Sequence, residues 1–155
     1  MPVLGLPHTD AQLFDLINVV LPAWLLLAVA PRWRHTKTIS AAAALLMSAL
    51  YTATLGTVMI APPAGDKLEV KDFFNLEGVG RALSTKALVL PCWVHYAAFD
   101  LWVGRWIAGD SVERGVPQLL LIPCLFLTWF MGPAGLLAYW LVRMPFNKAG
   151  KQKAA

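Results

Sequence analysis

The sequence predicts an all-α fold, an integral membrane bundle of four helices, and three observations support this. Hydrophobic residues make up 58% of the 155 residues and charged residues only 14%, whereas an ordinary soluble domain has about 45–50% and about 25%. The mean hydropathy is +0.59. The apolar residues form four blocks, each at least about as long as the 20 residues that a helix needs to cross a bilayer. A soluble enzyme is a poor interpretation, because a chain of this size cannot bury so much apolar surface in one core.

The first two blocks occupy residues 11–30 and 39–61, and proline follows both of them. Proline lacks a backbone N–H and cannot continue a helix, so Pro31 and Pro62 mark the ends. No Lys or Arg precedes the first block and it has no small-residue cleavage site, so we interpret it as a span and not as a secretory signal. Only ten residues precede it, so we expect no transit peptide. We therefore expect a bacterial cytoplasmic membrane, or a plastid membrane for a processed plant or algal protein.

The segment between the second and third blocks carries apolar residues at near-helical spacing. These residues are Phe73, Leu76, Val79 and Leu83. The spacing predicts a short amphipathic helix over 72–84 that lies in the membrane interface. A loop that packs over the bundle is the alternative.

The third and fourth blocks span residues 87–107 and 117–142. Gly132 and the proline that follows it predict a bend or break in the fourth helix. Residues 1–146 then form one domain, and 147–155 form a basic tail. Four spans place both termini on one side, with eight Lys and Arg residues there against five on the other. The positive-inside rule therefore predicts cytoplasmic termini.

Ionisable residues inside the blocks each cost at least about 2.5–3.5 kcal/mol to insert, so each needs a reason. The first block holds Asp15 and Asn18, three residues apart and therefore on one helix face. The third block holds His95, Asp100 and Arg105. Asp15 fits a cap of the first helix, Asn18 and His95 fit interhelical hydrogen bonds, and Asp100 fits a structural contact with Arg105 or a tyrosine. Asp100 lies deepest, roughly 20 Å along its helix, which makes it the strongest candidate for a chemical role.

Depth along the four helices predicts one polar and aromatic layer across the bundle. Its members are Asn18, Tyr51, Thr52, His95 and Trp129. A stripe of His95, Phe99, Trp102 and Trp106 follows one face of the third helix, and Tyr96 lies beside Asp100 on another. We expect the stripe to face a neighbouring helix or an apolar ligand.

Metal, nucleotide and nucleic-acid binding receive no support from the sequence. The histidines lie on different segments without HxxH spacing, and Glu77-Gly-Val-Gly80 lacks a phosphate-binding pattern. The basic residues, which give a net charge of +4, lie in the polar segments between the blocks and form no patch. We therefore expect no metal, no cofactor and no nucleic-acid partner.

Several strings of residues carry a resemblance to a known family. The most specific is Trp93-Val-His-Tyr-Ala-Ala-Phe-Asp-Leu-Trp-Val-Gly-Arg-Trp106. The others are Phe14-Asp-Leu-Ile-Asn18, Leu21-Pro-Ala-Trp24, Pro31-Arg-Trp33, Phe73-Phe-Asn-Leu-Glu77-Gly78-Val79, Leu127-Thr128 and Gly132-Pro-Ala-Gly135-Leu136. With these strings the chain resembles the abscisic acid deficient four-like family of small four-helix membrane proteins, over nearly its whole length. Plant members are chloroplast-membrane proteins needed to form neoxanthin from violaxanthin. The resemblance implies isomerisation of a carotenoid epoxide, or a related step on another polyene lipid.

Opening an epoxide to an allene needs a general acid at the oxygen and a base for a neighbouring proton. Asp100 is the candidate acid by its depth, and His95 or Asp15 is the candidate base. The candidate ligand-binding residues are Asn18, Tyr51, Tyr96, Phe99, Trp102, Arg105 and Trp129. The expected partners are membrane lipid and a carotenoid or other polyene.

Two other functions fit the composition. One is a small accessory subunit that binds pigment or lipid, as an oligomer or within a larger membrane complex. The other is a proton-coupled carrier that uses the same ionisable residues. The carrier fits less well, because four helices without an inverted repeat make a poor alternating-access machine.

Overall fold

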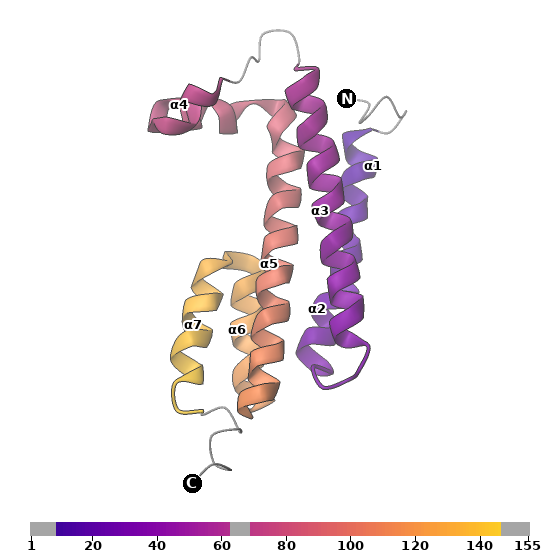
Figure 1. The fold of residues 1–155 in the computed structure, drawn as a ribbon, viewed down its shortest axis with the longest axis vertical. Helices are drawn as coiled ribbons and strands as arrows, with labels where there is room; N and C mark the ends of the chain where they lie inside the picture. The colour runs from indigo at the N-terminus through magenta and orange to yellow at the C-terminus, as the bar shows by residue number, and fades with distance from the viewer. Residues whose placement is uncertain (1–8, 63–68, 147–155) are drawn as a thin grey trace, which may run out of the picture. The chain divides into compact units, whose positions relative to one another are not determined.

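The computed structural model describes residues 9–62 and 69–146, and within these ranges it contains helices and no strand (Figure 1). The predicted all-α fold is therefore confirmed. In chain order the elements are α1 (Asp10–Asp15), the 3₁₀ turn η2 (Leu16–Val19), α2 (Val20–Val29), α3 (Thr36–Ile60), the 3₁₀ turn η3 (Val70–Phe74), α4 (Leu76–Ser84), α5 (Lys86–Arg114), α6 (Gln118–Met131) and α7 (Pro133–Arg143).

The chain divides into two compact units. The first unit combines the residues up to Asn18 with Leu46–Tyr96, and the second combines Val19–Leu45 with the residues from Ala97 onward. The long helices α3 and α5 each contribute to both units.

The structure contains three helical stretches that are long and apolar enough to cross a membrane. They are Asp10–Val29, Thr36–Ile60 and Lys86–Arg114, and they match the first three predicted helices. The first begins at Thr9, whose hydroxyl accepts from the Gln12 N–H in a capping box, so Asp15 is not the cap. The third continues past residue 107, where Asp110 and Arg114 pair one turn apart on its last turns.

The fourth predicted helix is wrong as a single span, because the chain reverses at Gly132. This residue has φ of +44°, which favours glycine, and Pro133 follows it as the first residue of α7. Figure 1 shows α7 running back beside α6. Gly135 makes the close approach possible, since a Cβ there would collide with the backbone of Thr128. Residues 117–142 therefore form a helical hairpin, and the 14-residue α6 is roughly 21 Å long.

The two ends of the described chain contact α5 in different units, and the prediction that both termini lie on one side of the membrane stays a prediction. In the first unit, Asp10 lines a small cavity with Ala87 at the start of α5. In the second unit, the Arg114 guanidinium at the end of α5 donates to the Phe146 carbonyl at 3.1 Å. Within the first unit the chain therefore begins near the start of α5, and within the second unit it finishes near the end of α5.

The predicted helix over 72–84 is present as α4, preceded by η3 and separated from it by Asn75. The Asn75 side chain caps α4 by accepting from the Gly78 N–H at 2.7 Å. The Arg81 guanidinium donates to the Asp72 carboxylate at 2.8 Å and so ties α4 to η3. The Glu69 backbone N–H and Arg81 hold the pKa of Asp72 below its usual value. Phe74 and Leu76 are 85% and 88% exposed, as an interfacial helix requires, although its place in a membrane stays a prediction.

Candidate functional site: a cavity in the first unit

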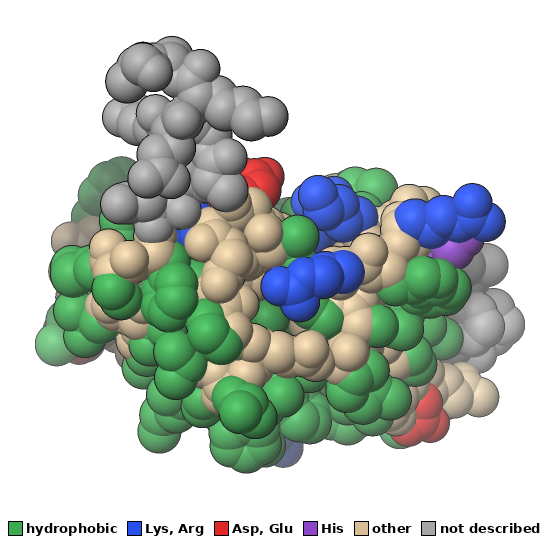
Figure 2. Space-filling model, turned by 90° about the horizontal axis from the view of Figure 1, so that it is seen from below, with side chains coloured by type: hydrophobic (Ala, Val, Ile, Leu, Met, Phe, Trp, Pro, Cys, Tyr) green, Lys and Arg blue, Asp and Glu red, His purple; other side chains and the backbone are tan. Residues whose placement is uncertain are grey.

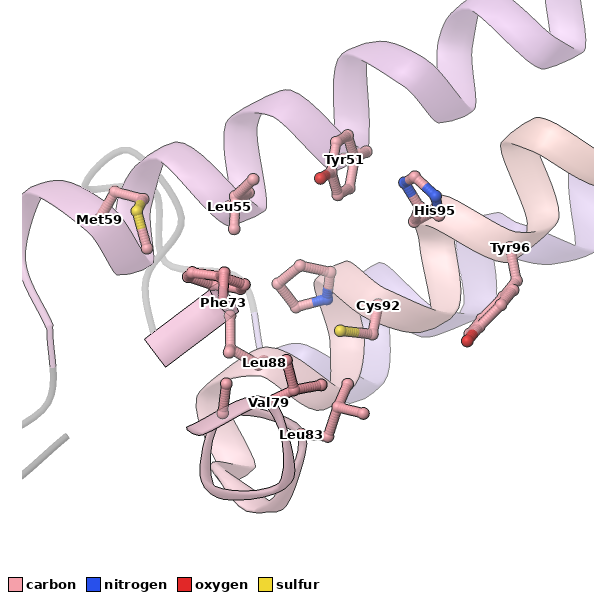
Figure 3. A pocket seen from close by; sticks show the side chains of 12 residues that line it. Tyr51, Leu55, Met59, Phe73, Val79, Leu83, Leu88, Cys92, His95 and Tyr96 are labelled. Atoms are coloured by element: carbon pink, nitrogen blue, oxygen red, sulfur yellow. The ribbon is translucent and has the colours of Figure 1, made fainter. Parts of the chain in front are cut away.

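The first unit contains a cavity of about 310 Å³, which we call the main cavity (Figure 3). Its lining comes from α3, η3, α4 and α5. The lining residues are Tyr51, Leu55 and Met59 from α3, Phe73 from η3, Val79, Ala82 and Leu83 from α4, and Leu88, Pro91, Cys92, His95 and Tyr96 from α5.

Helical spacing explains why these side chains share one space. Tyr51, Leu55 and Met59 follow one another at intervals of four and so form a single stripe along α3. On α5, Leu88 and Cys92 are also four residues apart, and His95 continues the same face one turn later. Of the four residues that predicted the amphipathic helix, Phe73, Val79 and Leu83 line this cavity, whereas Leu76 is exposed. The pattern that identified the amphipathic helix therefore also predicts one wall of the cavity.

A small buried cluster packs against α4 beside the main cavity. Val58, Ala82 and Leu88 are each no more than 5% exposed and pack together. Gly78 lies so close to the backbone of Asp72 that any Cβ would collide there. These contacts fix α4 over the end of the cavity.

Two polar side chains lie at the opposite end. The rings of Tyr51 and His95 meet edge to face with centroids 5.1 Å apart and an interplanar angle of 62°. Figure 3 shows this pair at one end of the cavity and Met59 with Phe73 at the other. Tyr51 lies nine residues before the end of α3, and His95 nine residues after the start of α5. Both therefore lie roughly 14 Å from those helix ends, a distance close to half of the thickness of a bilayer core, about 30 Å.

None of the twelve lining residues is Asp, Glu, Lys or Arg. An apolar cavity with a few convergent polar groups is the usual form of a small-molecule site. The main cavity is therefore suited to an uncharged apolar molecule that presents one polar group to Tyr51 and His95.

Of the other candidates in the first unit, Tyr96 lines the cavity, whereas Asp15, Asn18 and Thr52 lie outside its lining. Asp15 and Asn18 are exposed on the first helical stretch. Thr52 is exposed as well, and its hydroxyl donates to the Ser48 carbonyl at 2.9 Å on its own helix. Within this unit, only Tyr51 and His95 of the predicted layer come together.

In the second unit, Asp100 lies at the reversal of the chain. Its carboxylate packs so closely on Gly132 that a Cβ there would be 2.7 Å from Oδ1. The Arg105 Nε donates instead to the Lys37 carbonyl at 3.1 Å, and its guanidinium lies over the Trp102 ring at 5.5 Å. Of the structural alternatives for Asp100, contact with Arg105 is therefore replaced by contact with the α6–α7 turn.

Other aromatic residues of the second unit pack on α2, α6 and α7. Trp129 contacts the rings of Trp24 and Phe130, with centroids 6.5 and 4.9 Å away. Trp24 and Trp129 also line a second apolar cavity of about 290 Å³ between α2 and α6. Trp106 stacks on Trp140 of α7, whereas Phe99 is 59% exposed. Of the predicted stripe along α5, Trp106 thus contacts α7 while remaining 42% exposed, and Phe99 is more exposed still.

A buried charged cluster was missed by the sequence interpretation. Asp110 Oδ2 accepts from the Arg114 Nε at 2.8 Å and from the Tyr139 hydroxyl at 2.8 Å. Arg143 Nη1 lies 3.2 Å from the same oxygen, and its guanidinium lies 4.0 Å from the centre of the Trp140 ring. The four-residue spacing of Asp110 and Arg114 was the available signal, but the two partners on α7 required the hairpin.

The comparisons with known proteins place the chain in a family. Neither a curated protein nor a solved structure matches it. The part of the chain that the structure describes contains no group of three or more His, Cys, Asp and Glu side chains that could hold a metal ion. The model of the ABA DEFICIENT 4-like family matches residues 12–139, a range that includes the whole lining of the main cavity. The chain belongs to the ABA DEFICIENT 4-like family.

Proposed function

We propose that this membrane protein acts in carotenoid metabolism and binds one end of a carotenoid, or of a related polyene lipid, in the main cavity. The observation that carries the proposal is an apolar cavity with a tyrosine–histidine pair at its deep end. Family membership supports the substrate class, since the plant relatives are needed to form neoxanthin. The membrane we propose is the bacterial cytoplasmic membrane, or a plastid membrane in a plant or alga.

The reaction we propose is isomerisation of a carotenoid epoxide to an allenic alcohol. The Tyr51 hydroxyl donates its proton to the epoxide oxygen as the bond from that oxygen to the carbon next to the polyene breaks. His95 takes the proton from the adjacent polyene carbon, and the electron pair of that C–H bond forms the second double bond of the allene. The proton then passes from the His95 imidazolium to the Tyr51 phenolate. No atom or electron is gained or lost, so the step needs no co-reactant.

We assign the acid to Tyr51 and not to Asp100, because Asp100 packs on Gly132 in the second unit and does not line the cavity. Asp15 is exposed and lies outside the lining too, which leaves His95 as the base. Positioned acids and bases contribute about 10²–10⁴-fold each. We therefore expect Tyr51→Phe and His95→Phe to lower turnover by about that factor.

The test uses purified protein in lipid vesicles that contain a 5,6-epoxide carotenoid, with product measured by chromatography. Thr52→Val is the matched control, since it removes an exposed hydroxyl from the next residue of α3. Thr52→Val and Asp100→Asn should keep full turnover, and loss of turnover in Asp100→Asn with an intact fold would overturn the assignment of the acid. Binding of the carotenoid without conversion by the wild type would favour an accessory pigment-binding subunit instead.

A further inference from the structure

We infer that the main cavity recognises a single uncharged end ring of an isoprenoid, so that short molecules with the same ring are ligands as well as full-length carotenoids. This inference rests on the proposed function for the place of the ligand. It goes further in stating which part of the ligand the cavity recognises and which chemical groups it does not bind.

The length of the cavity limits what it can hold. Its wall on α3 extends from Tyr51 to Met59, a step of eight residues or roughly 12 Å. A carotenoid is about as long as a bilayer is thick, about 30 Å across the hydrocarbon core. The volume of about 310 Å³ is also at the lower end of the range for small-molecule sites. The cavity therefore holds less than half of such a molecule.

The rim provides a way out for the rest of the chain. Met59, Phe73, Leu83 and Tyr96 line the cavity and are between 49% and 61% exposed. Each of them is thus in contact with the cavity on one side and open on the other. A polyene whose ring lies at the deep end can leave between these side chains into lipid.

Depth and charge limit which ring can enter. The pair of Tyr51 and His95 lies roughly 14 Å from the helix ends, and the lining contains no Asp, Glu, Lys or Arg. A charged group at that depth would lose its hydration without gaining an opposite charge from an acidic or basic side chain. A hydroxyl, carbonyl or epoxide loses much less and can hydrogen-bond to the pair. The accepted polar groups are therefore small and uncharged.

The experiment follows the visible circular dichroism that zeaxanthin gains when an asymmetric protein site binds it. The competitors are 3-hydroxy-β-ionone, which has the same end ring on a short chain, and the sulfate ester of that molecule. We expect the neutral ionone to abolish the signal and the sulfate ester to be roughly 100-fold weaker. A zeaxanthin signal that the ionone does not displace would show whole-length recognition and overturn the inference. Competition by the sulfate ester at equal strength would overturn it as well.

Two variants tie the signal to the main cavity. Leu55→Trp places a larger side chain in the middle of the lining, and Met59→Trp makes a milder change at the rim. Both should lose the signal, while Leu45→Trp on the exposed face of α3 should keep it. A folded Met59→Trp variant that keeps the signal would overturn the inference even if Leu55→Trp fails to fold. Displacement by the ionone without any epoxide conversion would leave the inference standing and refute the proposed isomerase.

Discussion

Asp110 accepts hydrogen bonds from side chains on two helices of the second unit. Its own helix supplies Arg114, and α7 supplies Tyr139. Arg143 lies nearby with its side chain 11% exposed and its guanidinium stacked on Trp140. One carboxylate thus faces two largely buried guanidinium groups.

Replacing Asp110 with alanine should destabilise the second unit strongly. Removing one partner of a buried ion pair leaves the other charge uncompensated, which costs about 3–5 kcal/mol. The measurement is thermal unfolding in detergent, followed by circular dichroism. Glu113→Ala is the control, because Glu113 is an exposed carboxylate on the same helix. Equal losses of stability in the two variants would contradict the role given to Asp110.

The level of a residue along its helix was predictable from the sequence, but the direction in which its side chain points was predictable only in part. Counting along the helices placed Tyr51 and His95 at one level, and their rings do meet. The same counting placed Asn18 and Thr52 there, yet both are exposed. Which face of an apolar helix turns inward depends on packing, since a helix that is apolar all round has no stripe that marks the buried side.

At the level of elements, the composition of residues 117–142 predicts the helices α6 and α7 but not the reversal of the chain between them. Gly132 and Pro133 predicted a bend or break, and the break is present. Whether the chain then continues or reverses depends on contacts between residues far apart in sequence, such as Tyr139 with Asp110. The apolar length alone could not distinguish one span from two shorter helices.

The element formed by η3 and α4 should loosen in acid. The pKa of Asp72 is lowered, chiefly by the Glu69 backbone N–H and also by Arg81, so its contribution is complete above its ordinary value of about 4. That contribution is lost as the pH falls through the lowered pKa. In the wild type, the amides of Glu69 and Gly78 should therefore lose protection against hydrogen exchange below about pH 4.

Asp72→Asn is the comparison for this pH dependence. The amide cannot ionise, so exchange in the variant should be faster than in the wild type at neutral pH and should lack the added loss in acid. An acid-induced loss of equal size in both proteins would show that another group titrates.

At the level of the whole molecule, the number of crossing helices determines the topology. Three helical stretches are long and apolar enough to cross a membrane, and the hairpin follows them. Of the nine described Lys and Arg residues, six belong to the second unit and three to the first. Figure 2 shows Lys and Arg side chains together on one face, beside hydrophobic side chains. From this distribution and the positive-inside rule we predict that the start of α3 and the end of α7 lie in the cytoplasm.

Cysteine labelling in intact bacterial cells tests this topology. A membrane-impermeant thiol reagent should label Glu77→Cys on α4, whereas Arg34→Cys and Met144→Cys should react only after the cells are opened. All three positions are exposed, and the wild type gives the background of the native cysteines. Met144→Cys that behaves like Glu77→Cys would restore a fourth crossing helix and contradict the hairpin.

Pigment extraction shows whether the main cavity holds one end of a polyene. The protein is purified from a host that makes carotenoids, and the extracted pigment is measured by absorption and compared with the amount of protein. We expect bound polyene with the wild type and with Leu45→Trp, and none with folded Leu55→Trp. Equal pigment in all three proteins, or no polyene with the wild type, would contradict it.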